Sequence, residues 1–522
     1  MYVIQINVPM LLLMMILIFE IAYCGTPCEQ RFTKYGFVCV CNSTYCDTIR
    51  RPDRNPEDVD AILHYTTSKD GKVLELSHGS FNEPISDDEG CHIIIDAQKK
   101  YQEIIGFGTA FTDAAGINAA CLSESAQHHL ISAYYGPEGI GFVMGRVPIG
   151  GTDFSTRAYT LDDIKDDFEL SHFSLAPEDY DYKMPYMKKA MEISPKEIKW
   201  LCSAWSAPPW TKTNNKITGF GFLKKEFYRL WAQYHIRFLE EYKKHNFTFW
   251  GTTCGNEPLN AYLPFLVRFN SMGWHPSDQG EWVAQYLGPM LKESYGPINI
   301  IALDDQRFMM KFWEKMLAKA KDYVDGIGLH WYYDEVTPAS CLTTFHEKHP
   351  NLLILGTEAC AGYLPWDAGV KLGSWKRGSR YMEDIIENIN HWMCCWIDWN
   401  FALDENGAPN WVKNFVDSAI IVNCTRGEFY KQPMFYALAH LSAFNEPGAV
   451  RIGMKMTSQP FYKLECRDVA ALVMLNQHGG RVLVLNNKAS SSRTVIVEDR
   501  MKGKKAKMSL EPHSFHTILY RH

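Results

Sequence analysis

The 522-residue sequence lacks the features that mark several large classes of protein. After residue 24 it has no stretch near the roughly 20 consecutive apolar residues that a membrane-spanning helix needs. It has no internal repeat, low-complexity tract or long linker, and 53 Lys and Arg residues stand against 60 Asp and Glu residues. These absences argue against a polytopic membrane protein, a repeat array and a disordered chain, and we expect no nucleic-acid partner.

The composition is that of a well-buried globular chain, with 46% apolar and 13% aromatic residues. Met10–Phe19 is an unbroken apolar run, and the Ala-Tyr-Cys before Gly25 fits a signal-peptidase site. We predict a signal peptide over residues 1–24, with an uncleaved signal anchor as the alternative because no Lys or Arg precedes the run. Removal of residues 1–24 takes away one acidic residue and leaves a formal charge of −6. Protonation of the 18 histidines would make the surface cationic in an acidic compartment.

Four cysteines lie close together at the start of the exported chain. Cys28, Cys39, Cys41 and Cys46 predict a small β module over residues 25–50 that is stapled by disulfides. Pairing of Cys28 with Cys39 and of Cys41 with Cys46 is one of three connectivities, and a zinc site is a weaker alternative. We expect the remaining cysteines to be small buried hydrophobes rather than a second disulfide set. They include Cys202, Cys254, Cys360, Cys394 and Cys395.

Two surface features are compatible with a secretory protein. Sequons at Asn42, Asn246 and Asn423 predict glycans on the surface. The basic run Lys502–Lys507 favours a solvated turn over a phosphate or lipid contact.

Apolar segments that end in polar residues recur eight times through the middle of the chain. Between them lie stretches with helical spacing of apolar residues, for instance Lys225–Lys243 and Tyr381–Trp392. Strands alternating with helices in this way predict an α/β fold, a closed (β/α)8 TIM barrel over residues 98–445, with its active site at the carboxyl ends of the strands. The eight segments are Glu103–Asp113, Gly141–Asp153, Ile198–Trp210, Phe247–Pro258, Ile298–Gln306, Val324–Asp334, Leu352–Cys360 and Cys394–Leu403.

Both flanks of the barrel have the short alternating pattern of antiparallel strands. Arg481–Asn486 follows two glycines, and Lys72–Leu76 lies before the barrel. We predict a β-sandwich domain that is assembled from residues 51–97 and 446–522.

Two glutamates close predicted strands of the barrel. Glu257 ends the fourth strand and Glu358 ends the seventh. A carboxylate at the end of a buried strand is costly unless it is paired or used. Cleavage of a glycoside with retention needs one carboxylic acid to protonate the leaving oxygen and one carboxylate to attack the anomeric carbon. The pair therefore indicates a retaining glycosidase.

A series of short motifs runs from Cys28 to nearly the last residue. They are Gly106-Phe-Gly108, Thr112-Asp-Ala114, Arg146-Val-Pro148, Asp153-Phe-Ser155, Trp205-Ser-Ala-Pro-Pro-Trp210, Asn256-Glu-Pro258, Leu303-Asp-Asp-Gln-Arg307, His330-Trp-Tyr332, Glu358-Ala-Cys360, Asp398-Trp-Asn400, Pro409-Asn-Trp-Val-Lys-Asn414-Phe-Val-Asp417 and Tyr430-Lys-Gln-Pro-Met-Phe435. In this order the motifs resemble the lysosomal glucosylceramidases, or acid β-glucosidases, which are retaining glycoside hydrolases of clan A and family 30.

The resemblance implies a role for each matching residue. Glu358 matches the nucleophile, Glu257 the acid/base, and Arg146 the arginine that keeps the nucleophile ionised. Like-charge repulsion and burial are expected to keep Glu257 protonated until Glu358 is esterified. Substrate contacts are implied for Asp153, Trp205, Asn256, Trp399 and Asn414, and supporting positions for His330 and Tyr332. No cofactor is implied, and the barrel strands carry no metal motif.

Several of these residues have simpler interpretations on the sequence alone. A tryptophan is usually part of the core, Arg146 fits a buried structural ion pair, and His330 fits a hydrogen-bonded core histidine. We interpret Asp304, Asp305 and Asp398 as structural residues near the strand ends.

The chain departs from the family pattern at two positions. Gly255 stands where a glutamate commonly precedes the Asn-Glu-Pro motif, and Thr152 stands where a cysteine is familiar. We expect the chain to be active, because Asn256, Glu257 and Pro258 are intact.

These observations predict an exported β-glucosidase that hydrolyses glucosylceramide in anionic membranes, peripheral on the lumenal membrane of the lysosome. The resemblance implies a saposin-like activator as a partner. One alternative is a related β-glycosidase, such as a β-xylosidase or a β-1,6-glucanase. Another is a catalytically silent carbohydrate-binding glycoprotein.

Overall fold

The structure is a computed structural model that describes residues 25–49, 51–52, 56, 58–85, 89–459 and 464–521. The predicted signal peptide, residues 1–24, lies outside the described residues. Within the described ranges, no helix combines the length and the apolar character that crossing a membrane requires.

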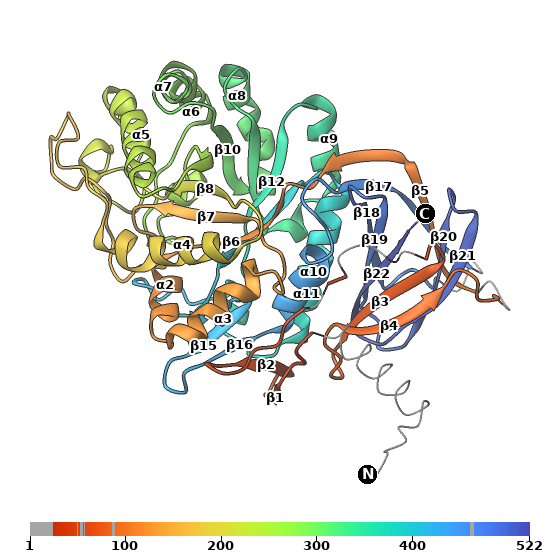
Figure 1. Cartoon of the computed structure of the whole chain (residues 1–522). Helices are drawn as coiled ribbons and strands as arrows, with labels where there is room; N and C mark the ends of the chain where they lie inside the picture. The colour runs from red at the N-terminus through yellow and green to blue at the C-terminus, as the bar shows by residue number, and fades with distance from the viewer. Residues whose placement is uncertain are drawn as a thin grey trace, which may run out of the picture.

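Eight parallel strands close into a barrel, as the sequence predicts (Figure 1). They follow one another around the barrel in chain order, and the last strand pairs with the first. Each predicted segment contains one strand, and strands such as β7 and β13 are buried throughout because both faces of a parallel barrel sheet are covered. The strands are β6 (Gly106–Ala110), β7 (Met144–Ile149), β8 (Lys199–Ala204), β9 (Phe249–Thr253), β10 (Asn299–Gln306), β11 (Gly326–His330), β12 (Leu353–Glu358) and β13 (Cys395–Asn400).

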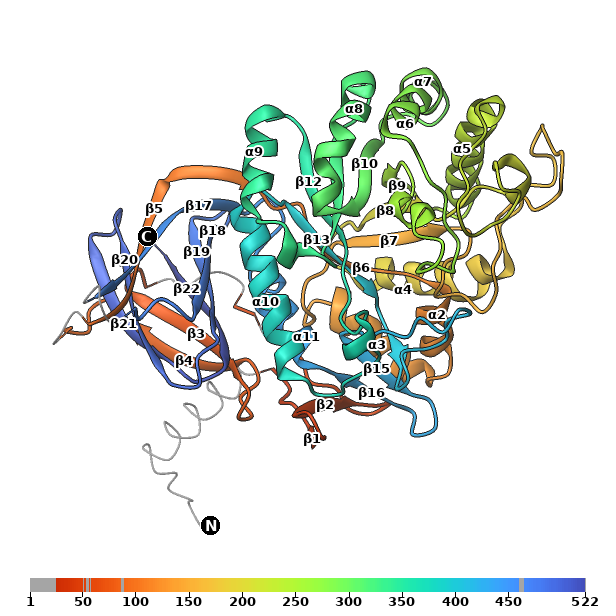
Figure 2. The same cartoon turned by 180° about the vertical axis from the view of Figure 1, so that it is seen from behind.

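Helices surround the barrel strands (Figures 1 and 2). Both helical predictions are confirmed: Lys225–Lys243 contains most of α5, and Tyr381–Trp392 contains the second half of α10. The buried side chains of α5 recur at helical spacing and face the barrel core. The helices are α2 (Asp113–Ala120), α3 (Glu124–Tyr135), α4 (Met184–Ile193), α5 (Tyr228–Lys244), α6 (Pro276–Trp282), α7 (Gly288–Ser294), α8 (Met310–Ala320), α9 (Ser340–Lys348), α10 (Trp375–Asn390) and α11 (Pro433–Ser442).

Both ends of the chain build a nine-stranded sheet beside α10 and α11 (Figure 2). Its strand order is β21-β20-β5-β17-β18-β19-β22-β3-β4. Ile62 of β3 and Val497 of β20 belong to one buried cluster although they lie near opposite ends of this order, so the sheet folds over a shared core. This confirms the predicted β-sandwich. Its strands are β3 (Ala61–Ser68), β4 (Glu75–Ser80), β5 (Gly90–Glu103), β17 (Val450–Gln459), β18 (Val469–Leu475), β19 (Gly480–Asn487), β20 (Arg493–Asp499), β21 (Lys504–Leu510) and β22 (Ser514–Arg521).

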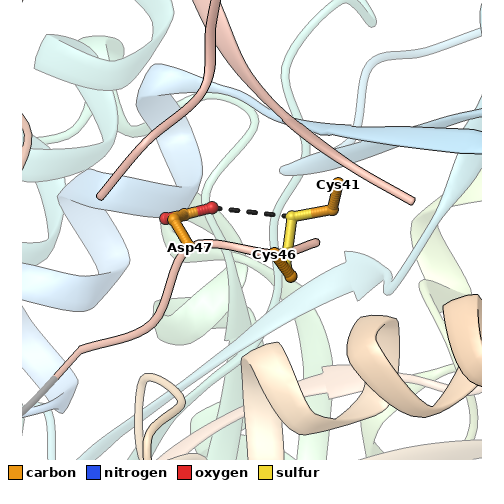
Figure 3. Close-up of side chains that lie close together, drawn as sticks. All are labelled: Cys41, Cys46 and Asp47. Carbon is orange, nitrogen blue, oxygen red and sulfur yellow. Dashed lines mark hydrogen bonds between the residues drawn. A yellow bond between two sulfur atoms is a disulfide. The ribbon is translucent and has the colours of Figure 1, made fainter. Parts of the chain in front are cut away.

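The cysteine-rich start belongs to a five-stranded sheet that combines distant parts of the chain. The order is β1-β2-β16-β15-β14. Asp47 connects the cysteine-rich segment to α11 and β16. Its Oδ2 accepts a hydrogen bond from Tyr436 of α11 at 2.8 Å, and its Oδ1 lies 3.0 Å from Lys431 Nζ of β16. The same Oδ1 lies 3.5 Å from the Cys41 sulfur (Figure 3). The strands are β1 (Gln30–Phe32), β2 (Phe37–Cys41), β14 (Leu403–Asp404), β15 (Ile420–Asn423) and β16 (Glu428–Lys431).

Four disulfides are present in the described residues. Cys28–Cys39 and Cys41–Cys46 are bonded, which confirms the connectivity raised above. The expectation of no second set is wrong, because Cys91–Cys466 and Cys121–Cys424 are also bonded. Their partners are 375 and 303 residues apart, so the fold brings them together and local spacing carries no sign of them. The cysteines expected to be buried hydrophobes are indeed free and buried, namely Cys202, Cys254, Cys360, Cys394 and Cys395.

The three sequons differ in exposure. Asn246 is exposed, whereas Asn42 and Asn423 are half-buried. The basic run at the start of β21 is partly neutralised, because Lys502 and Lys504 both pair with Asp60.

Candidate active site

Five ionisable side chains meet at the carboxyl ends of the barrel strands. Arg146 lies on β7, Asp304 on β10, His330 ends β11 and Glu358 ends β12. Glu257 follows β9 by four residues. All five are buried. Carboxyl ends of parallel barrel strands share one end of the barrel, which is why residues so far apart in sequence come into contact.

The carboxyl groups of the two glutamates lie close together. One oxygen of Glu257, one oxygen of Glu358 and one ring nitrogen of His330 all lie within 4.8 Å of one another. Retaining glycosidases hold their carboxyl groups about 5 to 5.5 Å apart, whereas inverting enzymes need roughly 6.5 to 9.5 Å. The backbone of Glu257 is left-handed, with φ of 42°, and its N–H donates to the Asp304 carbonyl at 2.9 Å. This bond fixes the turn that follows β9.

Glu358 is held by a donor at each oxygen. Arg146 Nη1 donates to Oε2 in a buried ion pair, and the Tyr332 hydroxyl donates to Oε1 at 2.7 Å. Burial raises the pKa of Glu358 above its ordinary value, while the charges of His330 and Arg146 act in the opposite direction. The nucleophile candidate is therefore oriented at both oxygens and faces two cations.

Glu257 accepts three hydrogen bonds. Gln306 Nε2 donates to Oε1 at 2.7 Å, and His330 Nδ1 lies 2.8 Å from the same oxygen. Asn260 Nδ2 donates to Oε2 at 2.5 Å. These three donors fix the orientation of the Glu257 carboxyl group.

Asp304 connects the two halves of the site. Its Oδ2 accepts from Arg146 Nη2 at 2.9 Å, and its Oδ1 lies 3.1 Å from His330 Nε2. Although burial acts in the opposite direction, Arg146 and His330 hold the pKa of Asp304 well below its usual range. Burial likewise acts to lower the pKa of His330, but Glu358, Asp304 and Glu257 raise it to about 10. The imidazole is thus protonated and donates from both nitrogens.

A cavity of about 160 Å³ lies over the two glutamates. Trp205 and Trp399 stack with ring centres 5.2 Å apart and line it. Asp153 Oδ2 accepts from the side-chain amides of Asn410 and Asn414, each at 3.1 Å, and burial raises the pKa of Asp153 to about 7. The lining also includes Phe154, Asn256, Glu257, Asn260, Phe269, Gln306, Tyr332, Tyr333, Glu358, Cys360, Tyr363, Asn414 and Val416.

A larger groove of about 1160 Å³ lies beside α10, against residues of β17 and β18. Several of its charged side chains are paired with each other, as Lys371 and Arg377 are with Asp367, and Arg380 with Glu335. Neither Glu257 nor Glu358 lines the groove, so the chemistry belongs to the smaller cavity. Glu358 ends its strand as predicted, whereas β9 ends at Thr253 and Glu257 lies in the turn beyond it.

The structure brings the predicted site residues to one end of the barrel. They are Glu257, Glu358, Asp153, Trp205, Asn256, Trp399, Asn414, Arg146, His330 and Tyr332. Sequence reasoning missed Gln306, Asn260 and Asn410, and it interpreted Asp304 as structural only. Asp304 and Gln306 lie in the Leu-Asp-Asp-Gln-Arg motif at the end of the fifth strand, and that position is the signal for them. Asn410 lies in the motif that begins at Pro409, and that position is the signal for it. Asn260 lies outside every motif and has no comparable sequence signal.

Gly255 has room for a side chain but an unfavourable backbone for one. A Cβ there would lie 3.7 Å from the Ala204 carbonyl oxygen and 3.9 Å from Trp274 Nε1, which has no hydrogen-bond partner among the described residues. Its φ of 125° favours glycine. At the second departure, Thr152 Oγ1 accepts from the Phe154 N–H at 2.9 Å and so shapes the turn around Asp153.

Two groups of side chains in the described part of the chain have the spacing of metal ligands. In the first, Cys41 and Cys46 are bonded to each other beside Asp47, so neither sulfur is a thiolate (Figure 3). In the second, with Glu257 and Glu358, His330 is protonated and has no lone pair to offer a metal. The chemistry of both donor sets is poorly suited to a metal ion.

The chain matches two models of one enzyme family. Residues 104–445 match the glycosyl hydrolase family 30 TIM-barrel domain, and residues 448–518 match the family 30 β-sandwich domain. The chain belongs to glycoside hydrolase family 30. It is a glycoside hydrolase, as its sequence predicts.

Curated relatives cover nearly the whole chain. It is 40% identical to putative glucosylceramidase 4 of Caenorhabditis elegans, over 95% of each chain, and 36% identical to lysosomal acid glucosylceramidase of Mus musculus, over 96% of each. Endo-1,6-β-D-glucanase BGN16.3 of Trichoderma harzianum is 27% identical over 74% of this chain and 78% of its own. The solved structure of SrfJ from Salmonella typhimurium has the same fold, with a TM-score of 0.79 and 24% identity over 88% of this chain and 100% of its own.

Proposed function

We propose that this chain is a retaining β-glucosidase that hydrolyses glucosylceramide to glucose and ceramide at a lipid surface. The observation that carries the proposal is that one carboxyl oxygen of Glu257 lies within 4.8 Å of one carboxyl oxygen of Glu358, at the end of a family 30 barrel. The names of the relatives at 36 and 40% identity support the substrate class.

In the first step Glu358 attacks the anomeric carbon while Glu257 gives its proton to the glycosidic oxygen. The bond from the anomeric carbon to that oxygen breaks, ceramide leaves as an alcohol, and glucose stays esterified to Glu358. Arg146 and Tyr332 orient the two oxygens of Glu358 for this attack.

In the second step Glu257, now ionised, takes a proton from water. The water oxygen attacks the anomeric carbon, Glu358 is released as a carboxylate, and glucose leaves with its original β configuration. The donors His330, Gln306 and Asn260 support the ionised Glu257 at this stage.

Neighbouring side chains fix the sugar. Asn256 Oδ1 accepts from Arg146 Nη2 at 2.7 Å, which orients the amide and leaves its N–H groups for the sugar 2-hydroxyl. Trp205 and Trp399 offer aromatic faces to the apolar side of the ring, and Asp153 binds hydroxyl groups at the far end.

The surroundings of the cavity fit a lipid substrate. Large apolar side chains are exposed in segments that follow β8 to β12, on the side of the barrel where the cavity opens. Phe265 is 91% exposed, and Leu266 and Trp366 are each 80% exposed. Exposed apolar side chains at one end of the barrel fit an interaction surface, and each side chain buried in lipid would contribute about 1.5 to 3 kcal/mol. This apolar rim consists of Phe220, Leu263, Phe265, Leu266, Phe312, Val336 and Trp366.

We further propose a lysosomal location on the lumenal membrane and a saposin-like activator as partner. The 36% identity with the mouse lysosomal enzyme over 96% of each chain supports the location. The charge balance supports binding to anionic lipid at about pH 5, because protonated histidines then outweigh the small net negative charge.

A β-1,6-glucanase is less well supported. The glucanase relative is 27% identical and covers 74% of this chain, and an apolar rim offers few partners to a polysaccharide. The completeness of the network around Arg146, Glu257 and Glu358 argues against a catalytically silent glycoprotein.

The test is the purified chain at acid pH with glucosylceramide in anionic and in neutral vesicles, beside aryl β-glucosides, aryl β-xylosides and a β-1,6-glucan. We expect turnover of glucosylceramide and of the aryl β-glucoside, with tighter binding to anionic vesicles that weakens with salt. Turnover of the glucan alone would assign the chain to the first alternative.

A further inference from the structure

The two oxygens of Glu257 have different surroundings. Oε1 is in contact with two donors, His330 and Gln306, and Oε2 with Asn260. A carboxylate oxygen has two lone pairs. Both lone pairs of Oε1 are therefore engaged, whereas Oε2 keeps one. The proton that Glu257 carries in the first step belongs on Oε2, the oxygen that Asn260 contacts.

Asn260 lies on the outer side of the acid/base. It belongs to a short 3-10 turn, Pro258–Tyr262, and its backbone N–H donates to the Glu257 carbonyl at 2.9 Å. Asn260 is half-buried and lines the cavity, and the chain runs on from it to Leu263 and Phe265 of the apolar rim. Asn260 therefore links the acid/base candidate in sequence to the apolar rim.

We propose that Asn260 is a positioning residue that holds Oε2 of Glu257 in the empty site and yields this oxygen to the glycosidic oxygen when substrate binds. An amide N–H favours the ionised carboxyl, so Asn260 also shifts the acid/base toward the form needed in the second step. The proton passes from Oε2 to the glycosidic oxygen and returns from water, and the Asn260 amide keeps its own protons throughout. The inference rests on the proposed retaining mechanism.

The test measures kcat/KM against pH for two soluble aryl β-glucosides. The phenyl glucoside needs protonation of its leaving group, and the 2,4-dinitrophenyl glucoside does not. For Asn260→Ala we expect a shift in the alkaline limb, which is the fall of kcat/KM on the alkaline side of the pH profile. With the phenyl substrate this limb should move to higher pH by about half to one unit, because the ionised Glu257 carboxyl loses a hydrogen-bond donor. With the dinitrophenyl substrate we expect kcat/KM at the optimum to stay within about twofold. Asn260→Gln, which keeps the amide, should return the limb toward the parent position.

Asn214 provides a matched control. It is also half-buried, follows β8, and its amide donates to the Thr218 carbonyl at 2.8 Å. Asn214→Ala should leave both pH profiles in place. Equal losses on both substrates in Asn260→Ala, with an unchanged alkaline limb, would reduce Asn260 to a structural role and overturn the inference. If the alanine variant does not fold, Asn260→Asp can be used instead, because it replaces the donor by a negative charge. A folded aspartate variant whose alkaline limb of kcat/KM does not move would also overturn the inference. A parent chain inactive on both glucosides would instead contradict the proposed function.

Discussion

His330 at the catalytic end of the barrel and His440 at the contact with the sandwich are buried alike, at 1% and 0% exposure, but differ in charge. His440 lies on α11 between two hydroxyl groups, with Nδ1 2.8 Å from Thr517 and Nε2 2.8 Å from Thr67. Burial lowers the pKa of His440 to about 3, with a further contribution from His64.

His330 has carboxylates where His440 has hydroxyls. Glu358, Asp304 and Glu257 overcome the effect of burial and raise the pKa of His330 to about 10. Burial alone therefore gives a neutral imidazole, and only a set of carboxylates makes it a cation. Concentrating buried charge in this way is costly, and buried charge of this kind is typical of functional sites. Among the described residues, the side-chain hydrogen bonds of His440 involve only hydroxyl groups.

The largest effect is expected from removing a charge at the catalytic end. Glu358→Gln keeps the shape of the side chain but cannot form the glucosyl ester, so kcat on aryl β-glucosides should fall on the order of 10⁴-fold. His440→Gln, at the domain contact, is the control and should keep most of the activity. More than a tenth of parent activity in Glu358→Gln would contradict the assignment.

Next in size is the loss of the acid/base. Glu257→Gln should reduce kcat/KM for glucosides with poor leaving groups by about 10² to 10⁴. An activated aryl glucoside should still complete its first step and stall at the second, and added azide should restore turnover by attacking the glucosyl-enzyme without a general base. Absence of azide rescue would argue that Glu257 has another role.

His440 at the domain contact should make the free energy of unfolding depend on pH. The pKa of His440 is lower in the folded chain than the ordinary value of 6.5, so its contribution is intact above about pH 6.5 and is lost as the pH falls toward 3. At pH 5 the loss is about 2 kcal/mol. His440→Gln should therefore lose less unfolding free energy than the parent between pH 7 and pH 5, as measured by urea denaturation.

His330 acts with the opposite sign. Its pKa is raised on folding, so its stabilisation is complete below about pH 6.5 and is lost as the pH rises toward 10. If the parent and His440→Gln lose the same unfolding free energy between pH 7 and pH 5, burial does not lower the pKa of His440, and the contrast with His330 fails.

The smallest effect concerns Gly255. Gly255→Glu restores the carboxylate familiar in the family beside Trp274, but the φ of 125° makes a side chain unfavourable by about 1 kcal/mol. We expect a slightly less stable enzyme with no gain in kcat, measured by thermal unfolding and by aryl β-glucoside turnover. A clear rise in kcat would mean that Gly255 impairs the parent chain.

The barrel was predictable because its signals are local. Each apolar segment ends in polar residues, as β12 does at Glu358, and the helical spacing between segments completes the pattern. The proposed catalytic pair came from the cost of burying a carboxylate near the end of a strand, and the other candidate site residues came from the resemblance.

Features that depend on distant contacts were not predictable. Cys91 and Cys466 meet because β5 pairs with β17, where Cys91 lies opposite Ser458, and the Cys466 N–H donates to Ser458 Oγ at 3.0 Å. Nothing near either cysteine encodes that pairing. Likewise Asp304 belongs to the site because it contacts Arg146 and His330, from strands two and six of the barrel. An acidic residue at a strand end cannot be told from a structural one until those cations are placed.

The most direct test of the account is covalent trapping with a 2-deoxy-2-fluoro-β-glucosyl donor that carries a good leaving group. The fluorine slows both steps, and the activated leaving group lets the first outrun the second, so a glucosyl-enzyme should accumulate. Peptide mapping is expected to place the adduct on Glu358, with slow recovery of activity as water releases the sugar. An adduct on Glu257, or hydrolysis that inverts the anomeric centre, would contradict the central claim.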